Sequence, residues 1–193
     1  MPSHYVPNTR IPTLVFPDSG QAARHVALLI ETLIRQNNAA DRPTVLGLAT
    51  GSTPVGLYRE LIRLHKQAEL DFSRVVTFNL DEYFPMGKDD PHSYYRWMHE
   101  TFFDHVNIPT ANIRIPDGTV QLDDIEDFCA RYEQAIRKAE NLPAVQKGHF
   151  EPIVLLVPAL YIVALWLHGA DPEADLILAL PPAPGDLKPL DPI

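Results

Sequence analysis

Residues 44–58 read TVLGLATGSTPVGLY, and this stretch decides the fold. Its first six residues are almost wholly apolar, so they predict a strand buried on both faces, as in a parallel sheet that helices cover on both sides. A loop of small residues follows. Pro54 then stands where the first turn of a helix is expected, because proline lacks the N–H that this turn leaves unpaired. The stretch predicts the strand, loop and helix of an α/β protein.

The same alternation continues on both sides of this stretch. The turn Pro17-Asp18-Ser19 supplies a helix N-cap, and apolar residues at helical spacing follow it. In chain order the pattern predicts a strand at 13–16, a helix from 19 to about 36, the strand at 44–49, a helix after Pro54, a strand at 74–80, a helix at 93–103, a strand at 112–115 and a helix at 123–138. Strands that alternate with helices indicate a parallel sheet with right-handed crossovers.

The character of the chain changes after residue 141. Nine of the 19 prolines lie in residues 142–193, with six acidic residues against two lysines, and helical periodicity stops there. We therefore expect an α/β domain over 1–141 and a divergent proline-rich, apolar tail over 142–193. The tail carries fifteen uncharged, mainly apolar residues at 153–167, but Pro158 interrupts them and a bilayer span needs about 20. We therefore do not expect a membrane anchor. The favoured interpretation is that this apolar block forms a strand pair or a buried helix that covers an exposed edge of the sheet.

Composition narrows the class of partner. The 193 residues carry 16 Lys and Arg against 25 Asp and Glu, a formal net charge of −9, and no run of basic residues. A nucleic-acid partner is therefore not expected. A single cysteine, Cys129, and an N-terminus without a signal pattern predict a cytoplasmic protein. Cys129 falls within the predicted apolar face of the last helix, so we expect it to be buried.

Two loops at strand ends carry the candidate chemistry, because ligands of parallel sheets bind where strands run into helices. The first loop comprises Thr50, Gly51, Ser52 and Thr53. Small residues let backbone N–H groups approach an anion, hydroxyls add donors, and the following helix presents its positive end. The loop is thus a candidate phosphate site. The alternative is an ordinary Ser or Thr N-cap that closes the turn.

The second loop begins with the acidic pair Asp81 and Glu82, directly after the apolar strand at 74–80. A carboxylate at that rim is partly desolvated, which raises its pKa toward the range of a general base. Alternatively, either residue caps the next turn. Adjacent side chains of an extended segment point in opposite directions, so one carboxylate is expected to function, with Asp81 as the catalytic candidate and Glu82 in support.

Metal and cofactor sites are not expected. His92, His99 and His105 do not share a ligand spacing, and no second cysteine supports zinc. The glycines match neither a Walker A loop nor a dinucleotide-binding motif. The aromatic residues between 94 and 103 are typical of core and helix packing.

Three segments together resemble glucosamine-6-phosphate deaminase: GLATGSTPVGLY at 47–58, VVTFNLDEY at 75–83, and SYY at 93–95 with the downstream Met98, His99, Phe102 and Phe103. The resemblance covers about residues 10–140. It implies a Rossmann-like fold shared with ribose-5-phosphate isomerase, with helices on both faces of the sheet. It also implies conversion of glucosamine 6-phosphate and water into fructose 6-phosphate and ammonia, without metal or organic cofactor, and a tendency to form homo-oligomers. By position, 50–53 matches the substrate-phosphate loop, and Asp81 matches the carboxylate that moves a proton between C2 and C1.

The chain departs from the family after Ala139. Family members continue into a Gly-x-Gly-x-x-Gly-His-Ile-x-Phe-Asn-Glu-Pro loop that supplies ring-opening groups, and these 193 residues do not contain it. A shifted reading frame is one hypothesis for the change. Three functions stay open: a deaminase impaired in ring opening, a non-catalytic module that binds a sugar phosphate, and a lactonase of the 6-phosphogluconolactonase type.

Overall fold

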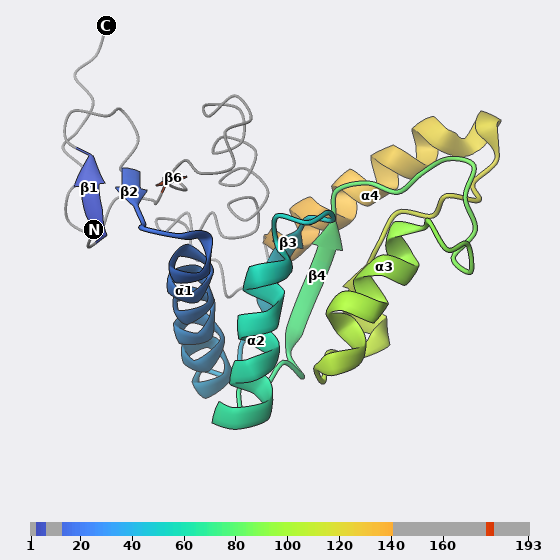
Figure 1. Cartoon of the computed structure of the whole chain (residues 1–193). Coiled ribbons are helices and arrows are strands. Elements are labelled where there is room, and N and C mark those ends of the chain that lie inside the picture. The colour runs from blue at the N-terminus through green and yellow to red at the C-terminus, as the bar shows by residue number, and fades with distance from the viewer. Residues whose placement is uncertain (1–2, 7–12, 141–176, 180–193) are drawn as a thin grey trace, which may run out of the picture.

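The computed structural model describes residues 3–6, 13–140 and 177–179 (Figure 1). They form two three-stranded sheets and four α-helices, with short 3₁₀ turns at Phe103–His105, Thr110–Asn112 and Leu122–Asp124. The apolar block at 153–167 and the rest of the tail up to residue 176 lie outside the described residues. Among the described residues, no helix combines the length and the apolar character that crossing a membrane requires.

The central sheet is parallel and has the order β3 (Thr44–Leu48), β4 (Val75–Asn79), β5 (Ile113–Arg114). Every residue of β3 is buried, as its apolar sequence predicts. The register pairs Thr44 with Val75 and Leu48 with Asn79. Because β3 and β4 end opposite each other, the loops that follow them leave the sheet at the same edge.

Two long helices cover one face of this sheet. Helix α1 (Ser19–Ala39) begins after Asp18, whose carboxylate accepts a hydrogen bond from the Gln21 N–H at 2.8 Å. Helix α2 (Val55–Ala68) lies alongside α1 (Figure 1). Buried Ala22, Val26 and Ile30 of α1 belong to the same apolar cluster as Leu57 and Leu61 of α2. The N-cap and the apolar periodicity in the sequence therefore predict both helices correctly.

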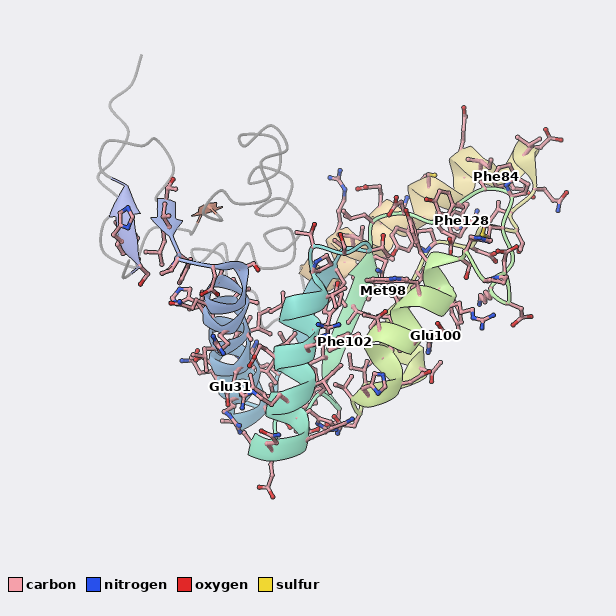
Figure 2. All side chains as sticks on the ribbon, viewed as in Figure 1. Glu31, Phe84, Met98, Glu100, Phe102 and Phe128 are labelled. Carbon is pink, nitrogen blue, oxygen red and sulfur yellow. The ribbon has the colours of Figure 1, made fainter. Side chains whose placement is uncertain are left out.

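Helix α3 (Tyr94–Thr101) completes this face of the core. Met98 and Phe102 are fully buried, and Figure 2 shows both on the side of α3 toward α2 and β4. The Phe102 ring stacks on the ring of Tyr58 from α2 with centroids 4.9 Å apart. The predicted packing role is thus confirmed for Met98, Phe102 and Phe103, which are buried.

The opposite face is covered by α4 (Ile125–Glu140). Its side chains Tyr132 and Ile136 pack against Phe78 and Val76 of β4. The prediction that Cys129 is buried is wrong, since it is exposed. The side chains of α4 that pack against β4 lie between Tyr132 and Ala139. Cys129 belongs to the first half of the helix, where every residue from 125 to 131 is exposed or only half-buried.

The first predicted strand forms but joins a different sheet. Strand β2 (Thr13–Val15) pairs antiparallel with β1 (His4–Val6) on one side and β6 (Ile177–Ala179) on the other. The sequence predicted a strand there and a parallel sheet overall, and the parallel arrangement holds for β3, β4 and β5. Leu14 and Phe16 still reach the core beside α1, which accounts for the apolar character of this segment.

Candidate active site

The two candidate loops lie together at the carboxyl edge of the parallel sheet. Leu48 and Asn79 are partners in the register, and the Asn79 amide donates a 3.3 Å hydrogen bond to the Leu48 carbonyl. Asn79 is 1% exposed, so this bond ties the two strand ends within the core. The loop that begins at Thr50 and the segment that begins at Asp81 therefore start side by side. The sequence predicted this convergence from the parallel topology alone.

The 50–53 loop is open to solvent and adopts a backbone shape that suits glycine. Gly51 has φ of +100° and nothing within 4 Å of the place where a Cβ would stand. Gly51 and Ser52 are exposed, while Thr50 and Thr53 are half-buried. Helix α2 begins at Val55 without a side-chain cap, so the alternative of a Ser or Thr N-cap is not what the structure shows. The Val55 N–H donates to the Ser52 carbonyl at 3.4 Å, and the positive end of α2 at this loop suits an anion.

Asp81 presents a carboxylate without a hydrogen-bond donor among the described residues. Partial burial of the carboxyl group raises its pKa above the ordinary value, and the negative charge of Glu82 raises it further. Both effects disfavour the ionised form. The direction is the one expected for a carboxylate at the end of an apolar strand, and it moves Asp81 toward the range of a general base.

Glu82, unlike Asp81, has hydrogen-bond donors for both of its carboxylate oxygens. One carboxylate oxygen accepts hydrogen bonds from the backbone N–H groups of Tyr83 and Tyr94, at 2.9 and 2.8 Å. The other accepts from the N–H of Tyr95 at 2.9 Å. The two acidic residues thus have different environments: Glu82 caps α3, and Asp81 has no hydrogen-bond donor within the part of the chain that the structure describes. The capping interpretation that the sequence left open applies to Glu82.

Tyr94 links the two loops. Its hydroxyl donates to the Tyr83 hydroxyl at 3.1 Å, and it also hydrogen-bonds the side chain of Thr50. The rings of Tyr83 and Tyr94 lie 4.6 Å apart. The bond to Tyr83 and partial burial raise the pKa of Tyr94. Sequence reasoning assigned Tyr94 no chemical role; its place directly after the N-cap Ser93, near the strand ends, was the available signal.

A cavity of about 420 Å³ opens beside this tyrosine pair. It is lined by Tyr83, Met86, Pro91, His92, Tyr94 and Trp97. The lining is mainly apolar, and neither Asp81 nor the 50–53 loop contributes to it. The cavity therefore adjoins the candidate site on its α3 side.

The histidines singled out in the sequence make local pairs. The Nδ1 atom of His92 lies 3.1 Å from Asp90, that of His99 lies 2.8 Å from Asp104, and His105 bonds the Glu100 carbonyl through its Nε2 atom at 2.9 Å. Within residues 3–6, 13–140 and 177–179, no group of three or more His, Cys, Asp or Glu side chains could hold a metal ion.

Comparison with known proteins identifies the class. The family model described as glucosamine-6-phosphate isomerases/6-phosphogluconolactonase matches residues 17–156, and the chain belongs to this family. The resemblance stated from the sequence, and the Rossmann-like α/β fold that it implies, are thereby confirmed.

Individual relatives point to one branch of the family. The chain is 52% identical over 99 residues to a glucosamine-6-phosphate deaminase of Thermoanaerobacter sp. (strain X514), covering 51% of this chain and 38% of the relative. It is 49% identical over 116 residues to the one of Cronobacter sakazakii (strain ATCC BAA-894), covering 60% of this chain and 42% of the relative. A solved monomeric glucosamine-6-phosphate deaminase is 38% identical with a TM-score of 0.58, over 64% of this chain and 48% of its own. The chain thus matches about two fifths of the length of these curated relatives.

Proposed function

We propose that this chain acts on glucosamine 6-phosphate, with the 50–53 loop holding the phosphate and Asp81 moving the proton of the aldose-to-ketose isomerisation. The observation that carries the proposal is the register of β3 and β4, which ends both strands at the same edge. An anion-binding loop and a carboxylate with a raised pKa then start side by side. The deaminases among the relatives support the choice of substrate.

The chemistry requires one base that serves two adjacent carbons. In the open-chain sugar, Asp81 removes the proton from C2, and the electrons of that C–H bond form the C1–C2 double bond of an enolamine. The π electrons of the C1 carbonyl move to O1, which takes a proton from water. Returning the proton to C1 produces an imine at C2. Water then adds to the imine and ammonia leaves, so the reaction as a whole consumes water. A carboxylate with a raised pKa suits this step because it must both take and return a proton.

The proposed phosphate site uses backbone and hydroxyl groups. The N–H groups around Gly51 and Ser52, the hydroxyls of Thr50, Ser52 and Thr53, and the start of α2 would surround the phosphate. The described part of this loop contains no Lys or Arg, so binding rests on hydrogen bonds and on the helix end. No metal or organic cofactor enters the proposed steps.

A non-catalytic sugar-phosphate-binding module is the second candidate. It is favoured by the sequence after Ala139, which does not contain the family pattern of ring-opening groups. A positioned acid–base group contributes about 10²- to 10⁴-fold in rate, so a chain without these groups is expected to bind better than it turns over. The lactonase alternative remains within the same family.

One assay separates these candidates. Purified full-length protein is incubated with glucosamine 6-phosphate, and fructose 6-phosphate and ammonia are measured together. Equal amounts of both products, lost in Asp81→Asn, support the deaminase. Saturable binding by calorimetry without turnover supports the binding module. Hydrolysis of 6-phosphogluconolactone with neither product supports the lactonase, and contradicts the proposal.

The cellular compartment and the oligomeric state of the protein are also proposals. The free, exposed Cys129 fits the reducing cytoplasm expected from the sequence. The homo-oligomer implied by the resemblance stays a prediction, and the solved relative described above is monomeric. Light scattering on the full chain distinguishes a monomer from a homo-oligomer.

A further inference from the structure

Glu82 bonds groups that lie far from it in sequence. Two of its three donors, the N–H groups of Tyr94 and Tyr95, are 12 and 13 residues further along the chain. Glu82 is half-buried, and both carboxylate oxygens are used. Such charge-assisted bonds are stronger than those between neutral groups. The strand end that carries Asp81 is therefore attached to the start of α3 through one side chain.

The start of α3 depends on this carboxylate for its hydrogen bonds. The first N–H groups of a helix have no acceptor within the helix itself. Here the Ser93 hydroxyl accepts from the Arg96 N–H at 3.0 Å, and Glu82 accepts from Tyr94 and Tyr95. A negative charge at this end of a helix is also favoured by the helix dipole. Without Glu82, two backbone donors of α3 would lose their protein acceptor.

These bonds also determine where Tyr94 lies. The backbone N–H of Tyr94 is held by Glu82, while its hydroxyl contacts Tyr83 and Thr50. The same tyrosine thus spans the region from the Asp81 segment to the 50–53 loop. Moving the start of α3 would move this hydroxyl relative to both loops.

Glu82 is further the charged group that acts on Asp81 among the described residues. The other titratable side chains nearby are Tyr83 on the same segment and Tyr94 on α3, and the 50–53 loop contributes none. The Glu82 charge opposes ionisation of Asp81, in addition to the effect of burial.

We propose that Glu82 is a positioning residue, which fixes α3 and Tyr94 against the strand end that carries Asp81 and sets the electrostatic environment of that carboxylate. The proposal rests on the proposed function for its catalytic meaning. Its structural content, however, concerns the free protein and can be measured without substrate.

Two substitutions test the charge of Glu82 and the length of its side chain. Glu82→Gln keeps the length of the side chain, removes the charge and leaves one acceptor oxygen in place of two. Glu82→Asp keeps the charge and shortens the side chain, so that one carboxylate no longer reaches both N–H groups. Glu100→Gln is the matched control. Glu100 lies on the same helix and is exposed. Among the described residues, its carboxylate bonds the Arg96 side chain. Two quantities are measured in the full chain, the Asp81 pKa by carbon-13 NMR and amide hydrogen exchange at Tyr94 and Tyr95.

Glu82→Gln is expected to lower the Asp81 pKa, because it removes the negative charge that opposes ionisation of Asp81. Glu82→Asp is expected to retain the Asp81 pKa and to speed exchange at both amides by about tenfold or more, as for local opening of a helix end. Glu100→Gln should change neither quantity. Exchange in α1 reports whether each variant is folded.

An unmoved Asp81 pKa in Glu82→Gln, or unchanged exchange at Tyr94 and Tyr95 in Glu82→Asp, would overturn the proposal. Absence of turnover in the unsubstituted protein would instead count against the proposed function alone, since neither quantity needs a substrate. The two failures are therefore distinguishable.

Discussion

Gly118 offers a sharp test of how the segment after Asp81 is held. Its carbonyl accepts a hydrogen bond from the Met86 N–H at 2.8 Å. A Cβ at this position would lie 2.5 Å from the Met86 carbonyl oxygen, closer still to the Tyr83 carbonyl oxygen, and 3.2 Å from a side-chain carbon of Glu82. Both oxygens belong to the backbone and cannot rotate away. In Gly118→Ala the two segments must separate by at least about half an ångström.

The cost follows from that displacement. Overpacking that forces the backbone to shift typically costs about 1–3 kcal/mol, which in a chain of this size lowers Tm by roughly 2–4 °C per kcal/mol. The free energy of unfolding is measured by urea denaturation followed by circular dichroism. Because the displaced segment includes Glu82, we also expect faster amide exchange at the start of α3.

Gly87→Ala is the matched control for Gly118→Ala. Gly87 lies in the same region, but nothing stands within 4 Å of the place where its Cβ would be. We expect Gly87→Ala to change stability by less than about 1 kcal/mol in either direction. Equal stabilities of Gly118→Ala and Gly87→Ala would refute the close packing on which this reasoning depends.

Three further predictions concern the site and its support. Asp81→Asn should raise the free energy of unfolding at pH 7, because a raised pKa means that ionised Asp81 disfavours the folded state. This gain in stability should vanish as the pH falls through the raised pKa and below the ordinary value of 3.8. Urea denaturation of both proteins at several pH values measures it. Gly51→Ala should cost about 1–2 kcal/mol, from its φ of +100°, and weaken binding of glucosamine 6-phosphate in calorimetry; equal affinity would exclude the loop from the phosphate site. Tyr132→Phe should cost about 1–2 kcal/mol in urea denaturation, because the Tyr132 hydroxyl bonds the carbonyls of Asn79 and Arg114 at 2.8 and 3.0 Å; a loss below about 0.3 kcal/mol would contradict that role.

Local patterns in the sequence were sufficient for the elements that build the sheet. The apolar run at 44–49 predicts β3 because burial on both faces leaves no room for polar side chains. Asp18 predicts the start of α1 because its carboxylate meets an N–H only three residues away. The convergence of the 50–53 loop with Asp81 also followed, since parallel strands end at a common edge.

Contacts between distant segments could not be predicted in the same way. The bonds of Glu82 to Tyr94 and Tyr95 span a loop whose path has no periodic signal. The approach of Gly118 to Tyr83 and Met86 depends on how two loops fold over each other. Both are tertiary features, and both bear on how Asp81 is positioned.

Two sequence interpretations depended on neighbours that the pattern does not reveal. Cys129 lies within an apolar periodicity, yet α4 packs against β4 only through its second half, from Tyr132 to Ala139, and the thiol is exposed. The strand at 13–16 has the composition of a sheet strand, but its partners β1 and β6 are antiparallel. Periodicity predicts that a segment forms an element, and pairing decides which sheet receives it.

The central claim is that Asp81 moves the C2 proton of a sugar phosphate held by the 50–53 loop. The most direct measurement is proton NMR of glucosamine 6-phosphate incubated with the protein in deuterium oxide. We predict loss of the C2 proton signal faster than in buffer, and loss of that acceleration in both Asp81→Asn and Gly51→Ala. Exchange that proceeds equally fast in Asp81→Asn would contradict the claim.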